Sequence, residues 1–168
     1  SWDLASNVNV KGDLKIDSGI LNSKGKLITL YGDWINNGSY NNGGSAVVFN
    51  GDTTISGSKN TSFATVDINP GKSLTGPLSG RIYVSGNWIN DGTFEGSDGT
   101  VVFNGGNNRI LGSGVNSFHD VLINSGKTLV APYARNFNVS GNWTNNGTFK
   151  ANSGTVTFNG NEQQDIKT

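Results

Sequence analysis

The sequence predicts an all-β fold: a single-stranded parallel β-helix, in which one chain winds through a solenoid of stacked coils. Three observations predict this class. Apolar residues occur in short alternating runs bounded by Gly, Asn, Asp and Ser, which is the pattern of strands and turns. No stretch keeps apolar residues at the 3.6-residue period of a helix. The chain also repeats itself at a fixed interval, as solenoids do.

The long repeat spans about 54–55 residues, which is the size of interval that repeat proteins show. One tryptophan and one phenylalanine of each copy keep this interval; they are Trp34, Trp88 and Trp143, and Phe49, Phe103 and Phe158. FATVDINPGKSL at 63–74 also matches FHDVLINSGKTL at 118–129. We therefore expect one continuous domain over 1–168, with repeats at about 1–27 (partial), 28–81, 82–136 and 137–168 (partial).

A shorter period of about 16–20 residues lies inside the long one, and it predicts the strands in chain order. Apolar triplets mark it at 8–10, 28–30, 47–49, 66–68, 82–84, 101–103, 121–123, 137–139 and 156–158. A unit this short cannot bury its own apolar face, so neighbouring units must stack. The pattern predicts about nine coils of two or three strands, with parallel pairing and right-handed crossovers.

Two other β architectures fit the repeat less well. A propeller blade is close to the long repeat in length, but three copies cannot close the usual ring of four or more blades. An antiparallel sandwich leaves the shorter period unexplained.

Composition excludes several classes of partner. The 12 basic and 12 acidic side chains cancel, and no basic cluster is present, which argues against a nucleic-acid partner. No run of about 18 apolar residues occurs, so we expect no membrane insertion. Cysteine is absent, which excludes disulfides and thiolate metal sites and is compatible with an exported protein.

The repeated tryptophans have two interpretations, core packing and stacking on a sugar. The segment VNVKGDL at 8–14 aligns with ITLYGDW at 28–34, which places Leu14 in the tryptophan position. Leu14-Lys15-Ile16 alternates, so Leu14 faces inward and Lys15 outward. A position that accepts Leu is a hydrophobic slot. We therefore expect Leu14, the three tryptophans and the three phenylalanines in the core.

Asparagine and glycine have a structural explanation in this pattern. The Asn-Gly pairs at 50, 104 and 159 are expected to supply left-handed and turn conformations. Asparagines at matching corners of stacked coils are expected to hydrogen-bond from coil to coil.

Histidine and aspartate are the candidates for catalysis. The only histidine, His119, lies beside Asp120, but its counterpart in the preceding repeat is Ala64, and no nucleophile is marked. We expect an outward residue, and the sequence predicts no catalytic residue and no cofactor.

A calcium site is the candidate for metal binding. Asp33, Asn87 and Asn142 share one position of the repeat, with Asp13 in the partial copy. Stacked carboxylates could bind Ca²⁺. However, only two carboxylates occupy the position and no calcium-loop motif is present, so no metal site is predicted.

Aromatic residues at outward positions are the candidates for glycan contact. Tyr31 and Tyr83 occupy outward positions of their strands, and Tyr133 lies in the loop of Pro132. Arg81 and Arg135 precede equivalent strands and are expected to pin loops.

The ends of a solenoid leave strand edges open. Ser1–Leu4 is expected to plug the first coil, with Trp2 as a lid. The segment NGNEQQDIKT stops within a repeat, so we expect either a piece of a longer solenoid or an end that receives another copy of the chain.

The segment GNWTNNGTF…GTVTFNG (140–160) and its earlier copies resemble the Asn/Gly-rich β-helix repeats of bacterial surface and secreted proteins. Filamentous-haemagglutinin-like and autotransporter-like adhesins are examples. The resemblance covers about Leu4 to Gly160. It implies an extracellular or cell-surface location and a non-enzymatic structural or adhesive segment. Such a segment would be a rigid stalk, or a subunit stacking end to end into a fibre, with a glycan or host cell-surface ligand as a candidate partner. The alternatives are a carbohydrate-binding module and a polysaccharide-cleaving enzyme.

Overall fold

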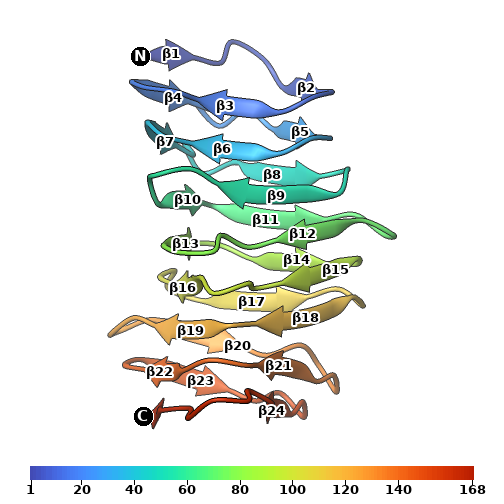
Figure 1. Ribbon diagram of the computed structural model, residues 1–168, viewed down its shortest axis with the longest axis vertical. Helices are drawn as coiled ribbons and strands as arrows, with labels where there is room; N and C mark the ends of the chain where they lie inside the picture. The colour runs from blue at the N-terminus through green and yellow to red at the C-terminus, as the bar shows by residue number, and fades with distance from the viewer.

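The computed structural model describes residues 1–168 and shows a solenoid whose coils stack along one axis, with the two termini at opposite ends (Figure 1). All paired strands are parallel and no helix is present, so the predicted fold class is confirmed. Strands β2 to β25 form eight coils of three strands each. Residues that lie above one another in neighbouring coils are separated by about 20 residues in the chain. No segment forms a helix of the length and apolarity needed to cross a membrane.

The three strands of each coil belong to three sides of the rod. Side 1 is one eight-stranded sheet: β2 (Val8–Val10), β5 (Ile28–Leu30), β8 (Ala46–Phe49), β11 (Thr65–Ile68), β14 (Trp88–Asn90), β17 (Asn108–Leu111), β20 (Thr128–Val130) and β23 (Thr148–Lys150). Side 2 is also one eight-stranded sheet: β3 (Leu14–Ile16), β6 (Trp34–Asn36), β9 (Thr53–Ser56), β12 (Ser73–Thr75), β15 (Thr93–Glu95), β18 (Val115–Phe118), β21 (Phe137–Val139) and β24 (Val156–Phe158).

Side 3 consists of two sheets in line. The first contains β1 (Trp2–Asp3), β4 (Ile20–Asn22) and β7 (Ser39–Asn41). The second contains β10 (Thr61–Phe63), β13 (Arg81–Val84), β16 (Thr100–Phe103), β19 (Asp120–Ile123), β22 (Trp143–Asn145) and β25 (Ile166–Lys167). The Asn42 side chain donates to the Ser62 carbonyl at 3.1 Å and bridges the two sheets.

Alternation within each triplet explains why these residues form strands. In β5, Ile28 and Leu30 are fully buried, whereas Thr29 points outward. The register then places like residues above one another, with Ile28 between Val8 and Val47. Each coil therefore covers the apolar face that the next coil cannot bury alone.

The structure has eight coils, not the nine expected from the nine apolar triplets. Most steps from one triplet to the next stay on one side of the rod and advance three strands. The two shortest steps, from Val66 to Ile82 and from Val121 to Phe137, change sides. They advance only two strands, from β11 to β13 and from β19 to β21. The triplets overcount the coils because these short steps do not complete a turn.

Because the long repeat is not a whole number of coils, each copy of it begins on a different side of the rod. One repeat contains eight strands, which is two turns and two thirds. Trp34 therefore lies on side 2, Trp88 on side 1 and Trp143 on side 3. Residues that are equivalent in sequence lie on different sides of the molecule, and three repeats are needed to return to the starting side.

One continuous core fills the rod. It is a single cluster of 29 buried apolar side chains, and it runs from Leu14 to Trp143. Among the expected core residues, Trp34, Trp88, Phe49 and Phe103 are fully buried, and Leu14 and Trp143 are 9% and 4% exposed. Phe158 departs from the expectation at 37% exposure, because β24 belongs to the last coil and only one neighbouring coil covers it.

The glycines after the repeated Phe-Asn pairs are required for a reason that differs from the expected one. Gly51, Gly105 and Gly160 do not have positive φ angles. Instead, a Cβ atom on each would overlap the backbone carbonyl oxygen of the coil before it, at Tyr31, Ser85 and Ser140 respectively. Glycine is therefore needed because two backbones approach closely, not because of a left-handed turn.

Corner side chains tie each coil to the next. Carboxylate or amide oxygens accept a backbone N–H of the following coil, as Asn37 does from Ser58 (2.9 Å), Asn60 from Arg81 (2.8 Å) and Asn142 from Asp165 (2.8 Å). Hydrogen bonds do run from coil to coil, as expected. Most of them join a side chain to the backbone, whereas the Asn69 amide donates to the Asn50 side-chain oxygen at 2.7 Å.

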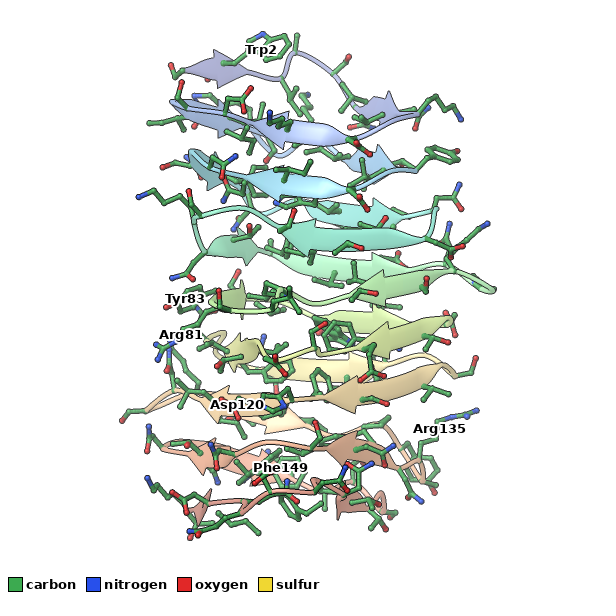
Figure 2. All side chains as sticks on the ribbon, viewed as in Figure 1. Trp2, Arg81, Tyr83, Asp120, Arg135 and Phe149 are labelled. Carbon is green, nitrogen blue, oxygen red and sulfur yellow. The ribbon has the colours of Figure 1, made fainter.

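Ser1–Leu4 covers the first coil in part, since Leu4 packs against the core and an open hollow is left beside it. Strand β1 pairs with β4 and extends side 3, with Trp2 in register with Leu21. The Trp2 side chain lies on the end of the stack (Figure 2), borders the hollow there and is 74% exposed. The hollow is also lined by the core residue Leu14 and by Val8 and Val10, which are partly buried against the core.

Candidate binding surface

The repeated tryptophans face the interior, and two of them, Trp34 and Trp88, take part in buried polar networks. The Trp34 indole N–H donates to the Thr61 hydroxyl at 3.1 Å, and the Asn36 amide donates to the same oxygen at 3.2 Å. In the next repeat, Trp88 donates to the Asn116 side-chain oxygen at 2.8 Å. Because these rings are enclosed and their N–H groups are satisfied, they are not a platform for a sugar.

His119 makes an interaction that holds a corner. Its Nδ1 lies 3.2 Å from the Ser140 hydroxyl of the next coil, which itself donates to the Phe118 carbonyl at 3.4 Å. The direction of the His119–Ser140 hydrogen bond depends on the tautomer of the imidazole. The His119 Nε2 is 3.9 Å from the Asp120 carboxylate, beyond hydrogen-bond distance. His119 thus hydrogen-bonds to Ser140 across the corner but not to Asp120.

The carboxylates of Asp13 and Asp33 accept hydrogen bonds from backbone N–H groups of the following coil. Asp13 accepts the Asp33 backbone N–H at 2.8 Å, and Asp33 accepts that of Thr54 at 2.8 Å. Asn87 and Asn142 do not join this pair, because they precede β14 and β22 on other sides of the rod. No group of three or more metal-ligating side chains is present.

The environment of Asp67 disfavours the charge of its carboxyl group. This side chain points outward from β11 on side 1, in register with Val48 and Ile89. Partial burial, and to a lesser degree the negative charge of Asp91, raise the pKa of Asp67 above its usual value near 3.8. Neither neighbour in register is a cation, so the group costs stability when it is ionised.

We expect Asp67→Asn to be more stable than the native chain at pH 7. Since the pKa of Asp67 is higher in the folded than in the unfolded chain, stability falls as the pH rises from about 3.8 through the folded value. The advantage of the variant should shrink as the pH is lowered and vanish below the usual value. Urea unfolding at several pH values measures this, with the exposed Asp98→Asn as control. Lower stability of Asp67→Asn at pH 7 would contradict it.

The structure does not bring the three candidate tyrosines together. Tyr31 follows β5, and the Lys11 ammonium lies 3.6 Å from the centre of its ring. Hydrogen bonding to Lys11 and then to Asn50 lowers the pKa of Tyr31. Tyr83 lies on β13 of side 3 and is half-buried. Tyr133 lies in the loop between β20 and β21 and is 75% exposed. Among the three, only Tyr133 presents an open ring.

Two exposed apolar residues are not among those that the sequence predicted for binding. Leu78 is 79% exposed in the loop after β12, and Val115 is 57% exposed on β18. The matching prolines Pro77 and Pro132 place Leu78 and Tyr133 at the same position of the repeat, which could have identified Leu78. Val115 has no such signal, because alternation does not show which outward residues stay uncovered.

The fold and its repeat define a class of protein: a parallel β-solenoid repeat protein. The chain matches no protein-family model, no curated protein and no solved structure.

Proposed function

We propose that the chain is a rigid, non-enzymatic segment of an extracellular or cell-surface bacterial protein of the adhesin kind. In this role it is a stalk, or a unit that stacks end to end with further coils. One observation carries the proposal: continuous parallel backbone ladders on sides 1 and 2 join all eight coils around a single core, and the ladder of side 3 has one break, between β7 and β10. A rod built in this way resists bending because every coil is hydrogen-bonded to the next.

The two end surfaces support stacking. Apolar side chains are uncovered in both terminal coils, with Ile20 46% exposed in the first and Ile166 55% exposed in the last. Unpaired strand edges at such ends accept further strands. Because the long repeat advances two turns and two thirds, further repeats of the same sequence continue the three sides without a break. The covering coils can come from the same polypeptide or from a second copy.

Small-angle X-ray scattering tests the proposal. We expect a rigid rod about 38 Å long for eight coils. If copies stack, its length should grow in whole multiples with concentration while its width stays constant. The variant Ile166→Asp places a charge on the end and should abolish growth. Leu78→Asp places the same charge on an exposed apolar position of the side and should not.

Scattering of a flexible chain would contradict the rigid-segment proposal. Growth that is abolished by Leu78→Asp and not by Ile166→Asp would contradict end-to-end stacking, since it would indicate association through the sides. A rod that keeps one length at all concentrations assigns the covering coils to the same polypeptide.

A further inference from the structure

The exposed apolar side chains away from the ends gather at one side of the rod. Seven large apolar residues are exposed, and four of them, Trp2, Ile20, Phe158 and Ile166, lie at the two ends. The other three are Leu78, Val115 and Tyr133. Val115 lies on side 2 itself, Leu78 follows its strand β12, and Tyr133 precedes its strand β21. Sides 1 and 3 have no such residue between the end coils.

From β9 to β24 the outward surface of side 2 carries a file of polar side chains, whereas Lys15 and Ile35 face outward in the first two coils. In successive coils the register places Thr54, Thr75, Glu95, Ser117, Asn138 and Thr157 above one another. Five of the six are uncharged and can both donate and accept hydrogen bonds. The spacing between them is that of adjacent parallel strands, about 4.8 Å. Side 3 differs, since its polar groove contains Arg81, Asp120 and Lys167.

Two loops border this file on opposite edges. Residues 76–80 connect β12 to side 3, and residues 131–136 connect side 1 to β21. The labelled side chains show the two edges in Figure 2, with Arg81 on one and Arg135 on the other. Leu78 and Tyr133 are thus three coils apart along the axis, about 14 Å. A line from Leu78 to Tyr133 therefore crosses the polar file diagonally.

Each loop also lines a depression on side 2. Pro77 and Leu78 line one together with Thr54 and Thr75. Arg135 lines the other with Val115 and Asn138. The Arg135 guanidinium donates to the Ser113 carbonyl at 3.4 Å, which holds its loop against the preceding coil. Tyr133 is therefore presented from an anchored loop.

We propose that side 2 binds a neutral polysaccharide, with Tyr133 and Leu78 contacting the apolar faces of sugar rings. The Thr, Ser and Asn side chains of the file hydrogen-bond to the sugar hydroxyl groups. The polar groups of this surface match those of a neutral polysaccharide. A row of donors and acceptors, repeated at a fixed spacing and nearly free of charge, fits a polymer whose units carry many hydroxyls and no charge.

Other polymers fit this surface less well. The single carboxylate of the file, Glu95, disfavours anionic polymers. A protein partner would need an apolar centre, whereas here the apolar residues lie mostly at the borders. The surface is present whether or not the rod is a stalk, so failure of end-to-end stacking would leave this inference standing.

Native gel electrophoresis in gels containing a soluble polysaccharide tests this surface, at an alkaline pH where the chain is anionic. The neutral probes are dextran, hydroxyethyl cellulose and galactomannan, and polygalacturonate is the anionic comparison. We expect at least one neutral probe to retard the native chain. Tyr133→Ala and Asn138→Ala should each weaken that binding about tenfold, the equivalent of about 1.4 kcal/mol.

The matched control is Tyr83→Ala, which removes the same type of side chain from side 3 and should leave binding unchanged. Circular dichroism checks that all variants are folded, and none of the altered residues belongs to the buried core. Retardation by no neutral probe, or by polygalacturonate alone, would overturn the proposal. Equal binding by Tyr133→Ala, Tyr83→Ala and the native chain would also overturn it.

Discussion

The chain with Gly105→Ala should unfold at a clearly lower urea concentration than the native chain, while Gly106→Ala should unfold at nearly the same concentration. A Cβ at position 105 meets the Ser85 carbonyl of the preceding coil, which is backbone and cannot swing aside. At position 106, no atom lies within 4 Å of the added Cβ. Overpacking of this kind costs about 1–3 kcal/mol, and it pushes apart two coils that the ladders hold together.

The comparison is sharp because the two glycines are adjacent and neither has a positive φ angle. Both substitutions therefore add the same atom to the same corner, and both reduce the freedom of the unfolded chain equally. Gly51→Ala should reproduce the loss, since its Cβ would meet the Tyr31 carbonyl in the same way. Equal stability of Gly105→Ala and Gly106→Ala would show that close backbone approach is not the reason for glycine in the repeated Phe-Asn-Gly.

Trp88→Ala should be the most destabilising single truncation of the core, with a loss of about 3–5 kcal/mol. The ring is fully buried and packs edge-on against Phe94, with ring centres 4.6 Å apart. Removal also deprives the Asn116 oxygen of its 2.8 Å hydrogen bond from the indole, which leaves the Asn90 amide as its remaining donor at 3.0 Å. Urea unfolding followed by far-UV circular dichroism measures the loss.

Two further variants separate the causes. Trp88→Phe keeps most of the packing but not the hydrogen bond, so it should lose about 1–3 kcal/mol. Trp2→Ala removes the same side chain from a position that is 74% exposed and should change stability by less than about 0.5 kcal/mol. Equal losses in Trp88→Ala and Trp2→Ala would contradict the inward placement of the repeated tryptophan.

The sequence was informative wherever a short local pattern decided the outcome. Alternation in Leu14-Lys15-Ile16 predicted which side chains face inward, and Leu14 indeed lies in register with Trp34 of the next coil. The reason is that period-two alternation is a property of a strand itself and needs no knowledge of its neighbours.

The candidate sites were less predictable because they depend on which side of the rod each copy reaches. Equivalence in sequence suggested that Asp33, Asn87 and Asn142 stack, yet they lie at three different corners. The same rotation separates Leu78 and Tyr133, which occupy one position of the repeat, and places them on opposite edges of side 2.

The sequence by itself determined the class of fold, the positions of most strands and the inward direction of the repeated tryptophans. The tertiary structure decided the number of coils, the side on which each repeat lies and the need for glycine in the Phe-Asn-Gly segments. The physical reason is that a coil closes after three strands, whereas the sequence repeats after eight. Only the stacking of complete coils decides which residues of different repeats lie above one another. The file of polar side chains on side 2 results from this stacking.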